Sequence, residues 1–224
     1  VRRLVAPTFP ELPYSCQTWR MVAKLRASSG LPDCHYLVTG IASGIGEAVG
    51  MALLEGGARV TGVDVQEPTV EVDRFSWCDL RDEEGIRSLV DELEGPVHGL
   101  CNAAGLSTSR LPHDIMAVNF FGLRRLTDLV IPLLEDGGSV VNVASCAGTD
   151  WPNSIDIVEG ILATPTTEAG LEQFGRLGFS SVDAYRLSKE CVTVYSFDVA
   201  TIAVDRRIRV NTVSPGAIYT PILD

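Results

Sequence analysis

Tyr185 and Lys189 are the residues whose types and spacing point most directly to chemistry. They lie four residues apart in a segment, residues 185–203, whose apolar spacing predicts a helix. Residues four apart share a helix face, so the lysine ammonium can lie beside the tyrosine phenol. A free phenol has a pKa of about 10, and a nearby positive charge lowers that pKa by favouring the phenolate. The pair is therefore a candidate general acid and base.

A glycine-rich turn follows the first predicted strand, residues 35–38, and leads into a predicted helix, residues 44–55. It reads TGIASGIG over residues 39–46. Glycines let a pyrophosphate approach the backbone closely, and the helix N-terminus offers it N–H groups and a positive dipole. The G-x-x-x-G-x-G spacing differs from the generic dinucleotide fingerprint, and a glycine turn can also serve tight packing. The strand–turn–helix context favours nucleotide binding.

Asp64 lies at the end of the next predicted strand, residues 59–65. A carboxylate there can accept hydrogen bonds from both ribose hydroxyls, and it repels the 2′-phosphate of NADP. The glycine turn contains no Arg or Lys that would pair with such a phosphate. The alternative is an ordinary aspartate at a strand end. If the turn binds a dinucleotide, these residues favour NAD over NADP.

Ser145 comes just after another predicted strand, residues 139–143. A serine past the carboxyl end of a parallel strand faces the crevice in which open α/β sheets bind ligands. Its hydroxyl could donate to a substrate carbonyl oxygen, although strand-end serines often only form turns or caps. Cys146 next to it has no histidine placed to act as its base, which argues against thiol catalysis.

Length and composition exclude several classes of protein. At 224 residues the chain is expected to form one domain. Its net charge of −11 repels phosphate backbones and anionic membranes, so we expect neither nucleic acid nor membrane as a partner. The six cysteines show no metal-ligand spacing and are expected to be reduced. This suits a cytoplasmic protein without a metal site.

Strand-like and helix-like segments alternate along most of the chain. This order predicts right-handed βαβ crossovers and an α/β fold with a Rossmann-like, doubly wound parallel sheet. The expected strands cover residues 35–38, 59–65, 97–101, 139–143 and 208–213, and the expected helices cover residues 44–55, 83–93, 114–134 and 185–203. Residues 66–79 are expected to form a loop.

Two segments depart from this alternation. Residues 1–33 are rich in Pro, Arg and Ser without a sustained period, and we expect a poorly ordered extension before a domain at 34–224. The extension lacks the apolar core of a secretory signal, but its Arg-rich composition leaves an organellar transit peptide open. Residues 150–183 greatly exceed an ordinary strand-to-helix connection. They are interpreted as an insertion with two short helices, 155–163 and 167–176, that serves as a lid or an oligomer contact.

Six motifs, in this order along the chain, together resemble the short-chain dehydrogenase/reductase family over residues 35–223. They are TGIASGIG at 39–46, Asp64, Asp79-Leu80, CNAAG at 101–105 with Cys101 in place of the family's first asparagine, Asn119 with Ser145 and the Tyr185/Lys189 pair, and Pro215-Gly216 with Thr220-Pro221. The resemblance implies that NAD is held by Gly40, Ser43, Gly44, Ile45, Gly46, Asp64, Asp79, Leu80, Asn102, Ala103, Ala104, Gly105, Tyr185, Lys189, Pro215, Gly216, Ile218 and Thr220. Within this set, the pair at 79–80 would contact adenine and Thr220 the nicotinamide carboxamide.

The same resemblance implies four catalytic roles. Tyr185 is the general acid and base, and Lys189 lowers its pKa and holds the nicotinamide ribose. Ser145 orients the substrate oxygen. Asn119 holds a water in a proton relay to the lysine, although an asparagine in a helix often only bonds its own backbone. The cofactor carries the hydride, while the protein supplies position and electrostatics.

Two features depart from most of the family. Forty residues separate Ser145 from Tyr185. This longer connection resembles the 3α-hydroxysteroid dehydrogenase/carbonyl reductase subgroup, where the insertion alters the dimer contact; a homodimer or homotetramer is implied. The sequence also stops at Asp224, whereas family members continue through a substrate-binding segment and a final strand. We therefore expect the C-terminal strand of the sheet to be missing.

The leading hypothesis is an NAD-dependent oxidoreductase that interconverts a secondary alcohol and a ketone. The substrate would be a small molecule, either a 3α-hydroxysteroid or another apolar carbonyl compound. One alternative is a truncated protein that binds NAD with weak or no catalysis. Another is a scaffold that binds a partner through the insertion at 150–183. The substrate itself cannot be read from the sequence.

Overall fold

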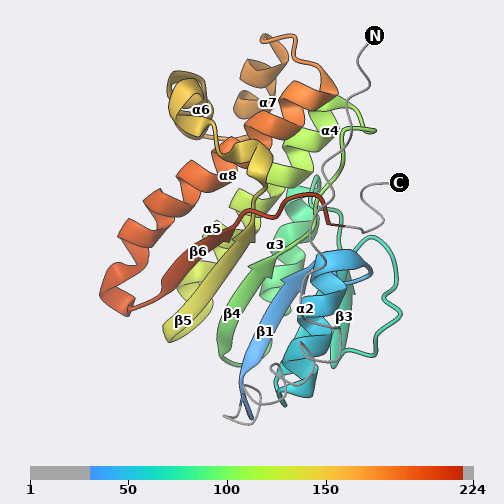
Figure 1. The fold of residues 1–224 in the computed structure, drawn as a ribbon. Coiled ribbons are helices and arrows are strands. Elements are labelled where there is room, and N and C mark those ends of the chain that lie inside the picture. Colours follow the sequence, from blue (N-terminus) through green and yellow to red (C-terminus); the bar gives the residue numbers. More distant parts are fainter. Residues whose placement is uncertain (1–30, 219–224) are drawn as a thin grey trace, which may run out of the picture.

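The computed structural model describes residues 31–218 (Figure 1). The predictions for residues 1–30 and for Thr220 lie outside the described residues. Six strands form one parallel sheet in the order β3-β2-β1-β4-β5-β6. The strands are β1 (His35–Thr39), β2 (Arg59–Asp64), β3 (Arg74–Trp77), β4 (Val97–Asn102), β5 (Leu134–Val143) and β6 (Arg209–Val213). The sheet confirms the predicted doubly wound α/β fold.

The strand order reverses between β1 and β4, because the chain first builds outward to β3 and then returns to pair β4 with β1. At such a switch point, the loops after the two strands diverge and leave a crevice at their carboxyl ends. Both the glycine turn after β1 and the segment after β4 open onto this crevice. The topology therefore brings the predicted cofactor residues to one edge of the sheet.

Helices cover both faces of the sheet (Figure 1). They are α2 (Gly44–Glu55), α3 (Glu83–Asp91), α4 (Pro112–Met116), α5 (Leu123–Val130), α6 (Ile155–Leu162), α7 (Thr167–Gly175) and α8 (Ser181–Ala203). Neighbouring residues of β1 point to opposite faces, as in any strand. Val38 packs with α2 on one face, while Leu37 packs with α3 and α5 on the other. The apolar strand runs reflect this burial on both sides.

Two predicted elements differ from the structure. The expected loop at 66–79 contains β3, a four-residue edge strand that pairs with β2. Its sequence, Arg-Phe-Ser-Trp, alternates polar and aromatic residues as a strand does, but over four residues only, and the sequence analysis missed this short signal. The expected helix at 114–134 is divided by a π-helix, Ala117–Gly122, and β5 begins already at Leu134.

The helix that carries the Tyr185/Lys189 pair begins earlier than predicted. Ser180 caps α8 by accepting a hydrogen bond from the backbone N–H of Asp183, and the Asp183 carboxylate accepts one from the Ser180 N–H. This capping box was readable as Ser-x-x-Asp ahead of the helix. Among residues 31–218, no helix has the length and apolarity to cross a membrane. The five cysteines of this range are free thiols.

Candidate active site

The glycine turn folds tightly against the backbone that follows β4. Gly40 and Gly44 have φ values of 73° and 60°, a left-handed conformation that favours glycine. A Cβ on Gly40 would lie 2.8 Å from the amide nitrogen of Ala104, and one on Gly46 would overlap the carbonyl oxygen of Gly40. Side chains at these positions would therefore collide with the backbone, so the tight packing of this turn requires glycine.

Ser43 and Ile45 lie at the start of α2. Ser43 is the exposed N-cap residue, and its hydroxyl makes no capping bond to the helix. Ile45 is half-buried in the first turn. The N–H groups of a first helical turn have no partner within the helix. The N-terminus of α2 thus suits a phosphate, as predicted from the sequence.

Two side chains fix the ends of the central strands. Thr39, at the end of β1, accepts hydrogen bonds from the amides of Ala103 and Ala104, both at 3.1 Å. Asp64, at the end of β2, accepts one from the amide of Ala42 at 3.0 Å and one from Gln66 at 3.1 Å. The carboxylate is half-buried beside the glycine turn.

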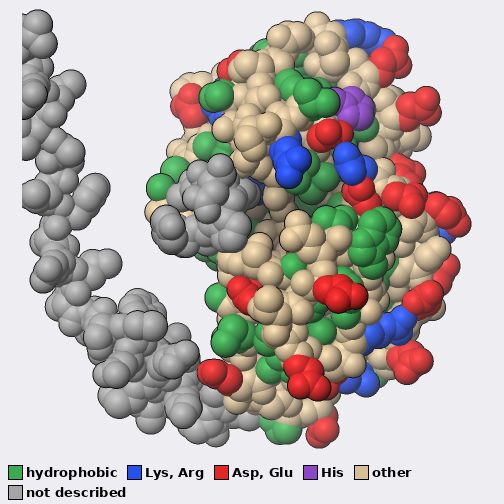
Figure 2. Space-filling model, turned by 90° about the vertical axis from the view of Figure 1, so that its right-hand side faces the viewer, with side chains coloured by type: hydrophobic (Ala, Val, Ile, Leu, Met, Phe, Trp, Pro, Cys, Tyr) green, Lys and Arg blue, Asp and Glu red, His purple; other side chains and the backbone are tan. Residues whose placement is uncertain are grey.

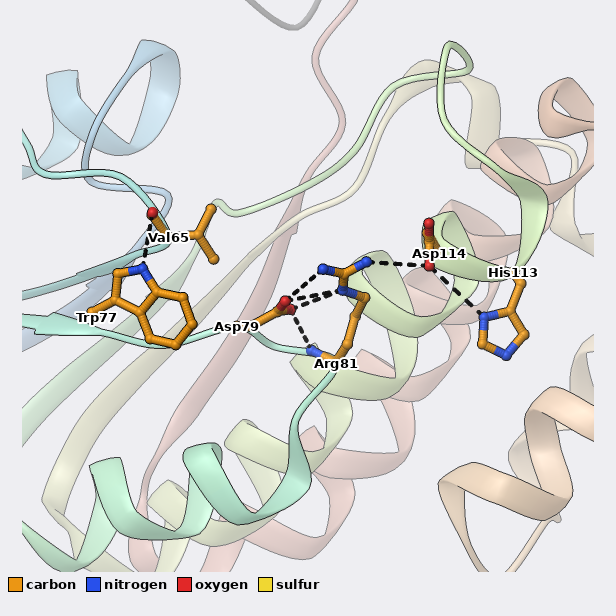
Figure 3. Close-up of polar contacts among 6 residues, drawn as sticks. All are labelled: Val65, Trp77, Asp79, Arg81, His113 and Asp114. Carbon is orange, nitrogen blue, oxygen red and sulfur yellow. Dashed lines mark hydrogen bonds and ion pairs between the residues drawn. The ribbon is translucent and has the colours of Figure 1, made fainter.

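Asp79 and Leu80 follow β3, and their side chains lie in different surroundings. The Asp79 carboxylate accepts bonds from the Arg81 backbone N–H at 2.9 Å, from Nε at 3.0 Å and from Nη2 at 2.6 Å (Figure 3). These bonds hold the pKa of Asp79 below its usual range, so it stays ionised. Arg81 also reaches Asp114 at the start of α4, at 3.3 Å. The Leu80 side chain is buried in the core, so only its backbone can face a ligand.

The Asn102 side chain points into the protein rather than the crevice. Its amide donates to Thr127 on α5 at 2.9 Å and to Asn142 on β5 at 2.8 Å. Asn142 in turn donates to Ser196 on α8 at 2.9 Å. This buried network connects β4 and β5 to α5 and α8. Any contact of Asn102 with a cofactor must therefore use its backbone.

Lys189 is buried where α8 meets the end of β5. Its Nζ donates to the carbonyl oxygen of Val143 at 2.8 Å and lies 5.8 Å from the centre of the Tyr185 ring. Burial lowers the pKa of Lys189 to about 8. A Cβ on Gly105 would lie 3.8 Å from the same Nζ. The structure thus places the Lys189 ammonium near both the Tyr185 ring and the segment after β4.

Asn119 lies on the π-helix and holds the same segment from the other side. Its Oδ1 accepts from the amide of Leu106 at 2.7 Å, and its Nδ2 donates to the Leu106 carbonyl at 3.0 Å. The amide therefore bonds a distant backbone rather than that of its own helix. π-Helices occur frequently at functional sites. Here the bulge keeps Asn119 close to Gly105, whose added Cβ would lie 3.4 Å from Oδ1.

Ser145 lies at the end of β5 and caps a short 3₁₀ turn. Its hydroxyl accepts a bond from the amide of Ala147 at 3.2 Å. The next residue, Cys146, donates its N–H to the carbonyl of Pro215 at 2.9 Å. This bond brings the turn after β6, with its exposed Gly216 and Ile218, to the Ser145 end of the crevice.

An ion pair between a half-buried arginine and a buried glutamate, which the sequence analysis missed, fixes the segment after Ser145. Ser154 accepts a bond from Arg186 at 3.1 Å, and Arg186 pairs with the fully buried Glu190 at 2.9 Å. Gly148 packs on the backbone of Lys189, since a Cβ there would lie 2.7 Å from its carbonyl carbon. The insertion is thereby anchored to α8. The spacing of Arg186 and Glu190, four residues apart, was the readable signal.

Comparison with known proteins decides the family. Residues 35–155 match the family model described as short chain dehydrogenase. The chain belongs to the short-chain dehydrogenase family. It is 33% identical to coniferyl-alcohol dehydrogenase of Pseudomonas sp. strain HR199, covering 87% of this chain and 76% of that protein. It is 31% identical to an NADP-dependent (R)-specific alcohol dehydrogenase of Lentilactobacillus kefiri, covering 84% and 74%.

A solved structure supports the same conclusion. The 3α-hydroxysteroid dehydrogenase of Pseudomonas sp. B-0831, complexed with NADH, has a TM-score of 0.72 and 29% identity, covering 84% of this chain and 74% of that one. These findings confirm the predicted fold and an oxidoreductase acting on CH–OH groups. The start of α2, where the N–H groups of the first turn have no partner within the helix, fits the pyrophosphate of a dinucleotide. The roles assigned to single residues stay predictions.

Proposed function

We propose that this short-chain dehydrogenase uses NAD to interconvert a secondary alcohol and a ketone. The observation that carries the proposal is the position of Lys189. Its ammonium is buried at the end of β5, beside the Tyr185 ring and against Gly105. A buried cation is costly unless it is paired or hydrogen-bonded, and perturbed buried groups of this kind cluster at functional sites. In this position it can stabilise a phenolate and bind a ribose hydroxyl.

The proton chemistry belongs to Tyr185. When the alcohol is oxidised, the phenolate accepts the hydroxyl proton; when the ketone is reduced, the phenol returns it. Ser145 donates its hydroxyl to the substrate oxygen and holds it toward the tyrosine. Bound NAD supplies the hydride acceptor. The four residues Asn119, Ser145, Tyr185 and Lys189 are thus the proposed catalytic set.

Lys189 supports this step in two ways. An ammonium has three donors, and the bond to Val143 uses one. Two donors are left for a ribose hydroxyl and for a water that leads the proton to solvent. The Asn119 amide is already bonded to Leu106. A water held by Asn119 would therefore have to contact its main chain.

The choice of NAD over NADP rests on charge. Asp64 lies beside the glycine turn, and its carboxylate would repel a 2′-phosphate on the ribose. Arg81, a cation near this end of the crevice, is already paired with Asp79 and Asp114. The NADP-dependent relative shows that similarity to the family does not decide the cofactor. The Asp64 carboxylate is the feature of this chain that supports NAD, rather than NADP, as the cofactor.

The proposed substrate is an apolar alcohol such as a 3α-hydroxysteroid. The name of the structural relative supports a steroid, and that of the coniferyl-alcohol dehydrogenase supports a primary aromatic alcohol as the second candidate. A cytoplasmic location, a domain at 34–224 and a homodimer or homotetramer complete the proposal.

Formation of NADH from NAD and a panel of alcohols tests the function. Turnover of 3α-hydroxysteroids is expected, and Tyr185→Phe should reduce it by about 10²- to 10⁴-fold. The NAD-induced rise in melting temperature should persist in this variant. Tyr36→Phe is the matched control and should leave turnover unchanged. Tyr36 lies near the amino end of β1, whereas the glycine turn follows the carboxyl end.

Three outcomes contradict the proposal. Turnover of coniferyl alcohol alone would identify a primary-alcohol dehydrogenase. A rise in melting temperature with NAD but without turnover on any alcohol would favour an NAD-binding protein of weak activity. The absence of any effect of NAD would favour a partner-binding scaffold.

A further inference from the structure

Among the Asp, Glu, Lys and Arg residues that the structure describes, only two are buried, and they are neighbours in the sequence. They are Lys189 and Glu190 on α8. The other carboxylates of residues 31–218 are partly or fully exposed, and many of them lie on the face shown in Figure 2. The proposed chemistry uses Lys189 and leaves Glu190 without a role. A buried carboxylate is costly unless it is paired, so its neighbours must compensate its charge.

Glu190 takes part in a closed set of three contacts. Its Oε1 accepts a hydrogen bond from Arg186, one turn earlier on α8, at 2.9 Å. The same Arg186 nitrogen donates to the hydroxyl of Ser154 at 3.1 Å, and this hydroxyl donates to Oε1 at 3.4 Å. The second carboxylate oxygen, Oε2, makes no hydrogen bond to the described residues. Arg186 is therefore the group that compensates the buried charge, and Ser154 is bonded to both.

Ser154 belongs to the insertion, and it makes these contacts in place of a local one. It is the N-cap residue of α6, yet its side chain accepts no bond from the first turn of that helix. A serine at this position usually caps its helix. Because the hydroxyl is bonded to Arg186 and Glu190 instead, the start of the insertion is held against α8.

Residues 145–154, the connecting segment between β5 and α6, touch α8 at two further points. Gly148 has no room for a Cβ, which would lie 2.7 Å from the carbonyl carbon of Lys189. The Trp151 ring packs edge-on against Phe197, with 5.7 Å between the ring centres. Positions 186, 190 and 197 share one stripe of an α-helix. The connecting segment therefore follows this stripe of α8 over about three turns.

The rest of the insertion is packed as part of the core. Val158 and Ile161 on α6 are fully buried. At the end of α6, the carbonyl of Leu162 accepts a bond from Arg124 on α5 at 3.1 Å. Figure 1 shows α6 beyond the carboxyl end of β5, at the end of the sheet where the crevice lies. These contacts indicate a fixed wall at this end of the sheet rather than a lid that opens.

The connecting segment begins with Ser145, the residue proposed to hold the substrate oxygen. The helix along which it lies carries Tyr185, the proposed acid and base. Arg186 and Glu190 each follow one member of the Tyr185/Lys189 pair, so they lie on the adjacent side of the same two turns. Ser145 and Tyr185 must reach the same substrate oxygen. A displacement of about 1 Å between such groups can cost about 10²-fold in rate.

We propose that Arg186 and Glu190 are positioning residues for the reaction. Arg186 compensates the Glu190 carboxylate, and both hold Ser154. The connecting segment then keeps Ser145 in place relative to Tyr185. This inference rests on the proposed function, because it requires that Ser145 and Tyr185 act together on an alcohol.

Steady-state kinetics with NAD and an alcohol that the wild type oxidises test the inference. Glu190→Gln removes the charge and keeps the size of the side chain. We expect kcat/KM for the alcohol to fall by about 10- to 100-fold. The dissociation constant of NAD should stay nearly unchanged, because the glycine turn and Asp64 lie on other elements. Glu172→Gln is the matched control, since Glu172 pairs with Arg176 at the same spacing but at the surface, and it should leave every constant unchanged.

Ser154→Ala provides a second variant, which removes no helix cap. It should lower kcat/KM as well, and the double variant with Glu190→Gln should lose less than the product of the two single effects, because both changes release the same segment. Fluorescence measures this release. The difference between each protein and its Trp151→Phe version gives the emission of Trp151, which should shift to longer wavelength when its contact with Phe197 loosens and water reaches the ring.

An unchanged kcat/KM in Ser154→Ala and in Glu190→Gln would overturn this inference and leave the proposed function standing. A shift of the Trp151 emission without a kinetic effect would do the same, because the segment would then be free to move without consequence. An equal loss of NAD binding and turnover would also overturn it, since it would show a general structural role. If Glu190→Gln does not fold, Ser154→Ala decides. A wild-type chain that oxidises no alcohol would refute the proposed function itself.

Discussion

Replacing Lys189 by methionine should stabilise the cofactor-free protein at pH 7 while ending turnover. Burial lowers the pKa of this lysine from 10.5 to about 8 in the folded chain. Between these two values the unfolded chain binds more protons than the folded chain. The free energy of unfolding therefore rises with pH through this window, and the cost of the buried ammonium is fully present below pH 8.

The magnitude follows from the size of the drop in pKa. At about 1.4 kcal/mol per pKa unit, a fall from 10.5 to about 8 corresponds to a cost of about 3 kcal/mol at pH 7. Methionine has a similar length and no charge, but it loses the bond to Val143, worth about 1 kcal/mol. The variant should thus be more stable by about 2 kcal/mol at pH 7. At pH 10 the two proteins should be nearly equal, because the cost has then fallen to about 1 kcal/mol and only offsets the bond to Val143.

Urea unfolding of both proteins at pH 7 and pH 10, without cofactor, measures this difference. Groups that titrate in both proteins cancel in the comparison. Arg186→Met is the matched control on the same helix, since it removes the partner of the buried Glu190 and should destabilise the protein at both pH values. A stability difference between wild type and Lys189→Met that does not change with pH would refute the reasoning.

Two further substitutions test the cofactor site. Asp64→Ala should weaken NAD binding and reduce the preference over NADP; an unchanged ratio of the two dissociation constants would contradict the role of this carboxylate. Gly46→Ala should lower the melting temperature and the NAD affinity, because its Cβ overlaps the backbone of Gly40, at a cost of about 1–3 kcal/mol. Gly175→Ala on α7 is the control, since a Cβ there meets nothing within 4 Å. Equal losses in both glycine variants would show that the turn is not unusually tight.

Local signals predicted much of the fold and the core of the site. The Tyr185/Lys189 pair could be read because residues four apart meet on a helix whatever lies around them. The glycine turn could be read because left-handed φ values at Gly40 and Gly44 select glycine. The strand β3 was missed because its alternation of polar and aromatic residues, Arg74–Trp77, spans only four residues, the shortest length at which such a pattern indicates a strand.

These local signals did not predict the direction in which side chains point. Asn102 stays a predicted cofactor residue, but its side-chain amide is bonded to Thr127 and Asn142, which lie 25 and 40 residues away. The Asn119 amide is likewise held by Leu106 across the crevice. Such partners meet only after the helices pack on the sheet, and no residue spacing in the sequence predicts these contacts.

The sequence by itself determined which reactive groups are present, their order and the family to which they belong. The tertiary structure alone decided how deeply Lys189 is buried, and hence its lowered pKa. It also placed Trp77 and Asp79 in the lining of one cavity between β3 and α3. Proton affinity and ligand contact depend on which atoms and how much water surround a group. Those surroundings are assembled from segments that are distant in the chain.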